Sequence, residues 1–268
     1  MVKRAPKGQV FLEDNEVLRR IADVIALTPD EVCLEIGMGR GQLTQHLVRR
    51  AREVIAVELE ERFVDAGAAV FAGYDNLTVV HANILDADWE ELVPAGEPVV
   101  VAGNIPFYIT GPILRVLFEQ RERIRRWTLM MQREVADRIC AATATKSYGA
   151  LSVKMQFWGR PRFQFVVPSA AFEPVPEVEA AVVTYAYKAP APNLERVHLF
   201  DPFVDFLFGG RRRKLGNRLD ALANGAARRE RLRAAVAATG CDLANRPERL
   251  TVDDFVALFR AAEPFLEV

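Results

Sequence analysis

Residues 32–41 read Val32-Cys33-Leu34-Glu35-Ile36-Gly37-Met38-Gly39-Arg40-Gly41. The first five are apolar except for Glu35 and have the length of a strand, and the glycines that follow mark a turn into a helix near 41–50. Strands and helices then alternate along the chain, which predicts an α/β fold with a doubly wound, mostly parallel sheet. The further predicted strands lie at 54–57, 77–80, 98–103, 127–131, 163–167 and 181–185, and the further predicted helices at 14–27, 60–71, 110–121 and 133–142.

The last third of the chain has a different pattern. Residues 188–193, Lys188-Ala189-Pro190-Ala191-Pro192-Asn193, have the composition of a linker, and the pattern after them is helical to the end. We therefore expect one domain at 1–188 and a small all-α domain at 189–268. A final helix is predicted after Thr251, because Asp254 stands three residues later in the spacing of a capping box.

The composition is that of an ordinary globular protein. The chain has 268 residues, of which 50% are hydrophobic, and a net charge of −1, so it is not a uniformly basic coat for nucleic acid. No apolar run reaches membrane-spanning length, and the first residues lack the apolar core of a signal peptide. Cys33, Cys140 and Cys241 are too far apart for metal-ligand spacing, so we expect reduced thiols, no metal site and a cytoplasmic location.

The glycine loop predicts a cofactor site. Its spacing is G-x-G-x-G, with Glu35 two residues before Gly37, and Glu58 closes the next predicted strand, where a carboxylate can bind ribose hydroxyls. A dinucleotide site would have its third glycine where Gln42 stands. The observed spacing is typical of S-adenosylmethionine sites. The alternative is a tight strand-to-helix turn without a ligand.

Residues 104–107 read Asn104-Ile105-Pro106-Phe107 and follow the predicted strand at 98–103. Ligands bind at the carboxyl ends of such strands. The Asn104 side-chain oxygen and a neighbouring carbonyl could accept the two hydrogens of an aminopurine amine and orient its lone pair, while Phe107 offers a face for stacking. The alternative is an Asn-initiated turn followed by a core phenylalanine.

These motifs, taken in order, resemble one family over nearly the whole chain: the small-subunit rRNA adenine dimethyltransferases, that is, the kasugamycin-sensitivity methyltransferase and its relatives. The opening Gly8-Gln9-Val10-Phe11-Leu12 is similar to its G-Q-N/H-F-L, and residues 104–110 match its N-L/I-P-Y/F-x-I-T/S. Further similar segments are Gln132-Arg133-Glu134-Val135-Ala136, Ser147-Tyr148-Gly149-Ala150-Leu151-Ser152-Val153, Phe172-Glu173-Pro174-Val175-Pro176-Glu177-Val178 and Arg211-Arg212-Arg213-Lys214-Leu215.

The resemblance implies a Rossmann-like class I methyltransferase that forms dimethyladenosine at two adjacent adenosines in a 3′-terminal hairpin of small-subunit rRNA. It also implies a role in ribosome biogenesis and a pre-ribosomal particle as partner. Nothing in the sequence calls for a dimer, so we expect a monomer. The implied catalytic residues are Asn104, Ile105, Pro106 and Phe107. Phe107 and Phe172 would stack on the flipped base. The implied cofactor-binding residues are Val10, Leu12, Gly37, Gly39, Glu58, Asn83 and Asn104.

Two positions depart from the family pattern. Val10 stands where the family usually has Asn or His, and Asn83 where it usually has an Asp that accepts the adenine amine of the cofactor. Asn83 can still accept through its side-chain oxygen, although without charge assistance. We therefore expect weakened cofactor affinity, with Asp86 as a candidate to substitute for the missing acid.

Two basic segments are candidates for RNA contact. Residues 209–233 hold nine Lys or Arg against two acids, and the densest run is Arg211, Arg212, Arg213 and Lys214. Such a run can bind phosphates, or it can be a solvated helical face. Arg121, Arg123, Arg125 and Arg126 form a second group, for which a solubilising loop is the alternative.

Two other functions remain open. The macrolide-resistance methyltransferases share the catalytic domain and modify large-subunit rRNA, but the matches at 147–153 and 211–215 favour the small-subunit family. A non-catalytic rRNA-binding assembly factor is the other alternative, because Val10 and Asn83 depart from the cofactor pattern.

Overall fold

The computed structural model describes residues 10–189, 194–209 and 214–266. Within them the chain forms a main sheet of seven strands in the order β4-β3-β2-β5-β6-β9-β7 and a small sheet of β1 and β8. The strands are β1 (Phe11–Leu12), β2 (Val32–Ile36), β3 (Glu53–Glu58), β4 (Leu77–His81), β5 (Val99–Asn104), β6 (Ile124–Gln132), β7 (Gly159–Val167), β8 (Phe172–Glu173) and β9 (Ala180–Tyr187).

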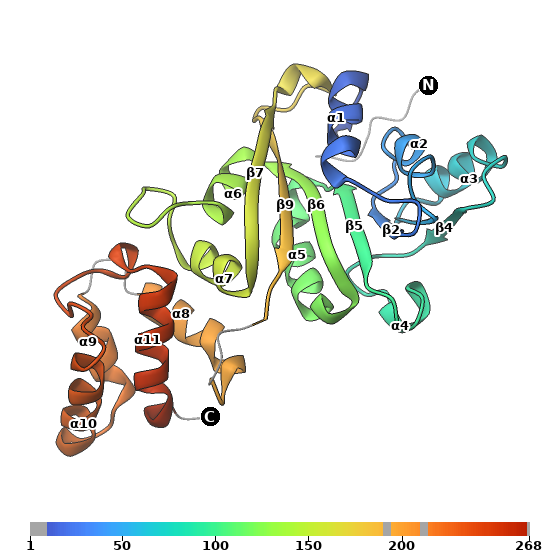
Figure 1. Cartoon of the computed structure of the whole chain (residues 1–268). Helices are drawn as coiled ribbons and strands as arrows, with labels where there is room; N and C mark the ends of the chain where they lie inside the picture. The colour runs from blue at the N-terminus through green and yellow to red at the C-terminus, as the bar shows by residue number, and fades with distance from the viewer. Residues whose placement is uncertain (1–9, 190–193, 210–213, 267–268) are drawn as a thin grey trace. The chain divides into compact units, whose positions relative to one another are not determined.

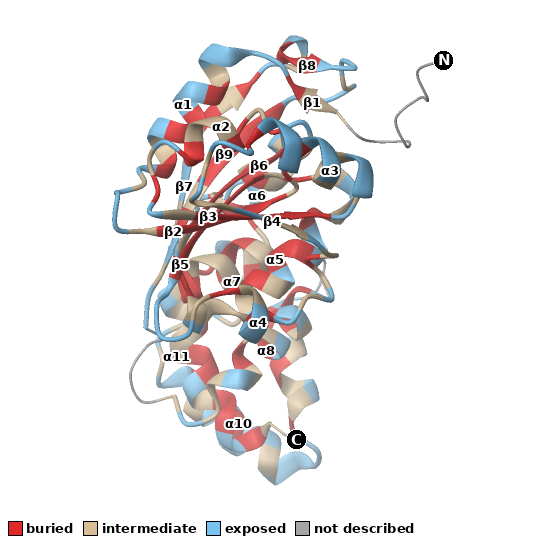
Figure 2. Cartoon of the chain, turned by 90° about the vertical axis from the view of Figure 1, so that its right-hand side faces the viewer, coloured by how far each residue is buried: buried red, intermediate tan, exposed pale blue. Residues whose placement is uncertain are grey.

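The predicted parallel sheet is confirmed. Strands β2, β3, β4, β5 and β6 pair in parallel, and β9 joins β6 antiparallel. Helices cover both faces, with α1 (Asn15–Ile25), α2 (Thr44–Leu47) and α3 (Glu61–Val70) on one face and α4 (Trp89–Leu92) and α5 (Thr110–Glu119) on the other (Figures 1 and 2). Burial on both faces explains why the strands are apolar runs rather than alternating patterns.

Helix α1 shows how the sequence pattern becomes packing. Asp14 caps it by accepting hydrogen bonds from Glu16 N and Val17 N, as the sequence predicts. Its buried stripe is Leu18, Ile21, Ala22 and Ile25. Leu18, Ile21 and Ile25 belong to one core cluster with apolar side chains of α2 and of strands β2, β3, β5, β6, β7 and β9. The cluster holds α1 against the sheet, where its neighbours are α2, β6 and β9.

Two local predictions differ from the structure. The helix predicted near 41–50 is reduced to the single turn of α2, because Gly41 has φ +80° and a Cβ there would lie 2.5 Å from the Phe71 ring. Helix α7 (Ala150–Trp158) was not predicted, although its sequence lies in one of the family-like segments. Cys33 is buried and unpaired, as expected, whereas the free thiol Cys140 is only half-buried.

Contacts divide the chain into two compact units, residues 1–136 with 161–187 and residues 137–160 with 188–268. This grouping differs from the expected boundary at 188, because residues 137–160 group with the C-terminal residues. The first unit contains the sheet strands described above, apart from the first two residues of β7. Figure 2 shows that its central strands are buried along most of their length.

The second unit is helical in its described part, apart from those first two residues of β7. Its helices are the end of α6 (Arg133–Ile139), α7, α8 (Phe200–Phe208), α9 (Leu215–Leu219), α10 (Ala226–Ala237) and α11 (Val252–Ala262). The Phe200 ring stacks on Phe157 at 3.7 Å between centroids and meets Phe259 edge-on at 5.5 Å. Thr251 and Asp254 form the predicted capping box of α11. A helical C-terminal region is therefore confirmed.

The predicted loop at 142–149 lies within this second unit. Ala144 N donates to Glu248 O at 3.0 Å, and Tyr148 Oη donates to Leu250 O at 2.9 Å. Gly149 N donates to Ser152 Oγ at 3.0 Å at the start of α7. Both ends of the loop are therefore fixed by hydrogen bonds to residues of their own unit.

Candidate active site

A cavity of about 510 Å³ lies at the carboxyl ends of β2, β3, β4 and β5. The chain runs from β2 outward through β3 to β4 and returns to β5 on the other side of β2. Such a reversal of strand order is where open α/β sheets bind ligands, and the volume suits a nucleoside-sized molecule. The predicted site residues that line this cavity are Val10, Leu12, Gly37, Gly39, Glu58, Asn83, Asn104, Ile105 and Pro106.

The glycine loop owes its path to left-handed backbone conformations. Gly37, Gly39 and Gly41 have φ values of +76°, +55° and +80°, which residues with a side chain rarely adopt. Gly37 N donates to Val57 O at 2.9 Å and so joins the loop to the end of β3. The loop therefore follows the edge of the cavity, where a ligand can approach its backbone.

Glu58 connects the loop to the end of β3. Gly39 N donates to its Oε2 at 2.8 Å, and Glu60 N donates to its Oε1 at 2.9 Å. The side chain is buried and lines the cavity. Each carboxylate oxygen has a second lone pair, so the group can accept ribose hydroxyls while it holds the loop.

Glu35 is a site residue that was predicted only as part of the glycine pattern. It lines the cavity and is 1% exposed, and Thr44 Oγ1 donates to its Oε2 at 2.7 Å. Burial raises its pKa to about 8, with the nearby charge of Glu58 acting in the same direction and the Thr44 hydrogen bond opposing both. At neutral pH this carboxyl is mainly protonated. The sequence feature that pointed to Glu35 was its position two residues before Gly37.

Strand β1 of the small sheet lines one side of the cavity, through Phe11 and Leu12. Leu12 pairs with Phe172, and Phe11 pairs with Glu173. The Phe11 ring meets Phe63 edge-on at 5.6 Å and lies so close to the loop that a Cβ on Gly39 would be 3.3 Å from it. This pairing brings the segment that starts at Val10 over the glycine loop, although the two are about 30 residues apart in sequence.

The backbone around Asn104 is fixed by its neighbours. Asn104 is the last residue of β5, and Ile105 N donates to Met130 O at 3.3 Å. Gly103 lies against β2, since a Cβ there would be 2.7 Å from Ile36 O. After the tetrad, Ile109 N donates to Pro106 O at 3.2 Å. Asn104, Ile105 and Pro106 therefore line the cavity from a rigid strand end.

The aromatic residues are placed differently from the expectation of two stacking rings. Phe172 is 2% exposed and belongs to the core cluster, and Phe107 is half-buried and packs against the same cluster. Neither is among the residues that line the cavity. Tyr108 does line it and is 67% exposed. Tyr108 was not predicted as a site residue, because the family pattern leaves its position open.

Asn83 reaches the cavity from the turn after β4. Its Nδ2 donates to Asp86 Oδ2 at 2.6 Å, and its Oδ1 accepts from Leu85 N at 3.1 Å. Asp86 is exposed and is not among the lining residues. Asp86 was expected to take the place of an acid at position 83. It contacts Asn83 instead and does not line the cavity.

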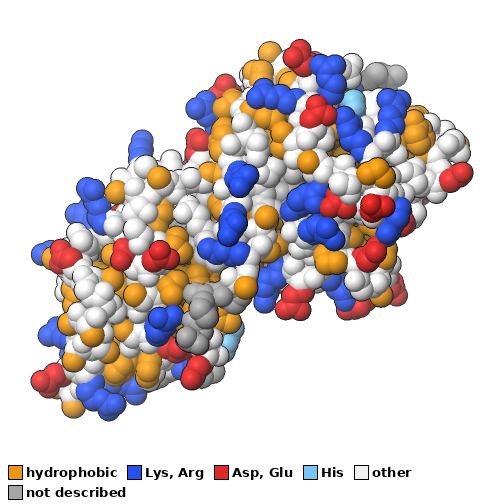
Figure 3. Space-filling view, viewed as in Figure 1, with side chains coloured by type: hydrophobic (Ala, Val, Ile, Leu, Met, Phe, Trp, Pro, Cys, Tyr) orange, Lys and Arg blue, Asp and Glu red, His pale blue; other side chains and the backbone are white. Residues whose placement is uncertain are grey.

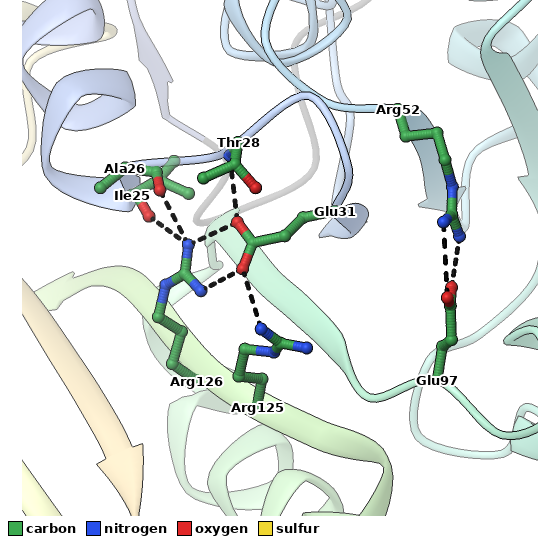
Figure 4. Close-up of polar contacts among 8 residues, drawn as sticks. All are labelled: Ile25, Ala26, Thr28, Glu31, Arg52, Glu97, Arg125 and Arg126. Atoms are coloured by element: carbon green, nitrogen blue, oxygen red, sulfur yellow. Dashed lines mark hydrogen bonds and ion pairs between the residues drawn. The ribbon is translucent and has the colours of Figure 1, made fainter.

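The second basic group lies at the opposite edge of the sheet, where β2 and β6 begin. Arg126 pairs with Glu31 at 2.6 Å and donates to Ile25 O and Ala26 O at 3.2 Å and 2.9 Å (Figure 4). Arg125 lies 3.8 Å from the same carboxylate. The Arg126 hydrogen bond lowers the pKa of Glu31. These contacts join the end of α1 to β6, which gives Arg126 a structural role.

The first basic group can be placed only in part. Arg211, Arg212 and Arg213 lie outside the described residues, and Lys214 is exposed just before α9. On the face shown in Figure 3, basic side chains are spread widely and acidic ones lie among them. This mixture agrees with the near-zero net charge.

The described residues hold no candidate for two other kinds of site. No group of three or more His, Cys, Asp or Glu is arranged there to hold a metal ion. In the same residues, no helix has both the length and the apolar character needed to cross a bilayer.

A family profile described as ribosomal RNA adenine dimethylase matches residues 2–262. The chain belongs to this family. A relative named ribosomal RNA small subunit methyltransferase A in Geobacillus thermodenitrificans is 36% identical over 97% of this chain and 91% of its own length. A relative of the same name in Geobacter metallireducens is also 36% identical, over 96% of this chain and 94% of its own length.

Two solved structures share the fold. A dimethyladenosine transferase from Plasmodium falciparum superposes with a TM-score of 0.82 at 21% identity, covering 95% of this chain and 98% of its own. The 23S rRNA methyltransferase ErmE superposes with a TM-score of 0.75 at 28% identity, covering 94% of this chain and 99% of its own. The expected class I methyltransferase fold, S-adenosylmethionine as methyl donor and rRNA adenine methylation are therefore confirmed for this family member.

Proposed function

We propose that this chain forms dimethyladenosine at two adjacent adenosines in a 3′-terminal hairpin of small-subunit rRNA, within a pre-ribosomal particle. The observation that carries the proposal is Asn104, which lies at the end of β5 and lines the same cavity as the glycine loop and Glu58. Two relatives that align with over 90% of this chain at 36% identity are named ribosomal RNA small subunit methyltransferase A. Their name supports small-subunit rRNA as the substrate.

The cavity residues suit the methyl donor. Backbone groups of the glycine loop and the Glu58 carboxylate would hold its ribose, with Asn83 at its adenine and Val10 and Leu12 covering it. The sulfonium of S-adenosylmethionine supplies an activated methyl group. No metal and no strong base is therefore needed, and the protein has mainly to position the acceptor amine.

Asn104 would position that amine. Its side-chain oxygen and the carbonyl of Ile105 or Pro106 accept the two amine hydrogens and so direct the nitrogen lone pair towards the methyl group. Pro106 O already accepts from Ile109 N, so it would use its second lone pair. The second methylation has only one amine hydrogen to bind. The site must then orient the amine with one hydrogen bond fewer.

Stacking of the flipped adenine on Phe107 and Phe172 remains part of the proposal. Because Phe172 is buried and Phe107 is half-buried in the same cluster, both rings would have to become more exposed to reach a base. Tyr108 needs no such movement.

The remaining parts of the proposal concern the whole protein. We assign residues 1–188 to catalysis and residues 189–268 to RNA contact, with Arg211, Arg212, Arg213 and Lys214 binding phosphates. The protein would act as a monomer in the cytoplasm, where small subunits are assembled.

The substrate is tested by methyl transfer from labelled S-adenosylmethionine to unmethylated small subunits and, in parallel, to large subunits. Product nucleosides are resolved by mass. We expect dimethyladenosine in small-subunit rRNA alone. Dimethyladenosine in large-subunit rRNA would instead favour the function named for ErmE, which covers 94% of this chain at 28% identity. RNA binding without any transfer would favour a non-catalytic assembly factor.

A further inference from the structure

Asn83 and Asp86 form a hydrogen-bonded pair in the turn after β4, at the side of the cavity that Asn83 lines. The Nδ2–Oδ2 distance is 2.6 Å, and Asp86 N donates back to Asn83 O at 3.0 Å. Asn83 lines the cavity, whereas Asp86 is exposed outside it. The acid is therefore placed to act on Asn83 rather than on a ligand.

The contacts of Asn83 admit one orientation of its amide. A carboxylate only accepts hydrogen bonds, so Asp86 must face Nδ2, and the Leu85 N–H only donates, so it must face Oδ1. Rotation of the amide by half a turn would place Oδ1 against a carboxylate and Nδ2 against an N–H. Both contacts would then be repulsive.

This orientation suits an adenine. An amide oxygen has two lone pairs and an amide nitrogen has two hydrogens, and the contacts to Leu85 and Asp86 use one of each. The second lone pair can accept from an adenine amine, and the second hydrogen can donate to a ring nitrogen. Paired contacts of this kind are how Asn distinguishes adenine from other bases.

We propose that Asp86 is a positioning residue, which fixes the Asn83 amide so that its oxygen faces the adenine amine of S-adenosylmethionine. The inference rests on the proposed placement of that adenine at Asn83. The family pattern has an acid at the position of Asn83, where it would contact the adenine directly. In this chain the acid is Asp86, three residues later, and it contacts Asn83 instead of the ligand. The pair as a unit then replaces a directly binding carboxylate.

An acid at position 83 should therefore be harmful in this chain. Asn83→Asp would place a second carboxylate within hydrogen-bond distance of Asp86 Oδ2, and the two charges would repel. The double change Asn83→Asp with Asp86→Asn restores a donor opposite an acceptor. We expect the single change to weaken ligand binding and the double change to recover most of it.

The test measures binding by calorimetry for S-adenosylhomocysteine and for its inosine analogue, in which an oxygen replaces the adenine amine. A misplaced polar contact of this kind changes the preference for one base by about tenfold or more. We expect wild type to prefer the adenosine ligand, Asp86→Ala to lose most of that preference, and Asp86→Asn to keep it, because the oxygen of the new amide would still accept from Nδ2 of Asn83. Asp65→Ala, which removes an exposed carboxylate of α3, is the matched control and should leave the preference unchanged.

Two results would overturn the inference, and they distinguish failure of the role of Asp86 from failure of the proposed cofactor site. If Asp86→Ala weakens both ligands by the same factor, or neither, Asp86 does not orient Asn83. If wild type binds neither ligand, the assignment of the cavity to the methyl donor fails, and the inference fails with it. A thermal melt of each variant shows that the compared proteins are folded.

Discussion

Among the single residues of the site, Glu35 is the least expected. A protonated carboxyl at the end of β2 donates or accepts as its partners require, and it avoids a second negative charge beside Glu58. Thr44 Oγ1 links it to the first residue of α2. The carboxyl thus holds the strand end to the helix that the glycine loop enters.

Glu35 should make stability depend on pH. Its pKa is about 8 in the fold and near 4.5 when unfolded, so the folded state binds more protons between these values. The contribution of Glu35 to stability is then highest below about pH 4.5 and falls as pH rises towards 8, by at most about 1.4 kcal/mol per pH unit. Urea unfolding of wild type and Glu35→Gln from pH 5 to 9 should show this slope only in wild type. Equal slopes in both proteins would contradict the assignment.

The residues whose roles depend on backbone position were predictable from the sequence. Gly37, Gly39, Glu58 and Asn104 stand at strand ends, and parallel strands bring their carboxyl ends to one edge. Asn83 was also predicted to bind the cofactor, but its hydrogen bond to Asp86 and the position of Tyr108 were not predictable, because both depend on side-chain orientation within turns. Three of the residues expected to bind RNA lie outside the described residues.

Among the strands and helices, the close approach of β5 to β2 sets the distance between Asn104 and the glycine loop. Gly103→Ala would place a Cβ 2.7 Å from Ile36 O, and a backbone atom cannot move aside cheaply. We expect a loss of about 1–3 kcal/mol in the free energy of unfolding, together with reduced methyl transfer. Gly73→Ala is the control, because a Cβ there meets nothing within 4 Å. Denaturant unfolding that gives equal stabilities for the two variants would disprove this packing argument.

The ion-pair network of Figure 4 acts on a different element contact, between the end of α1 and the start of β6. Arg126→Ala leaves the Glu31 carboxylate, whose side chain is 11% exposed, without its closest cation. We expect a loss of about 1–3 kcal/mol in the free energy of unfolding at pH 7. Because the pKa of Glu31 is lowered in the fold, its contribution is present above about pH 4.5 and is lost as pH falls.

Arg125→Ala is the matched control for that prediction, since Arg125 is 58% exposed and 3.8 Å from Glu31. It should cost less than about 1 kcal/mol. Methyl transfer should be nearly unchanged in both variants at low temperature, because the network lies at the opposite edge of the sheet from the cavity. Equal losses of stability would show that Arg126 has no special role.

The element order was largely predictable, because strands buried on both faces are read directly as apolar runs. The pairing of β1 with β8 was not, because two-residue strands leave no periodic signal. The grouping of residues 137–160 with the C-terminal residues depends on long-range contacts such as Tyr148 with Leu250, which no local pattern predicts.

For the molecule as a whole, ligand binding should stabilise the fold. S-adenosylhomocysteine at about 100 times its dissociation constant should add about 2.7 kcal/mol to the free energy of unfolding. NAD should add nothing, because Gln42 occupies the position of the third glycine of a dinucleotide loop. Thermal unfolding with each ligand checks both expectations. Stabilisation by NAD of similar size would argue for a different cofactor.

The decisive test is the rate of a single methyl transfer by Asn104→Ala to unmethylated small subunits, with labelled S-adenosylmethionine and mass analysis of the nucleosides. Loss of the group that positions the acceptor amine should reduce the rate by about 100-fold or more. Calorimetry should still detect binding of S-adenosylhomocysteine, through the glycine loop and Glu58. Dimethyladenosine formed by Asn104→Ala at close to the wild-type rate would show that this strand end does not position the target amine.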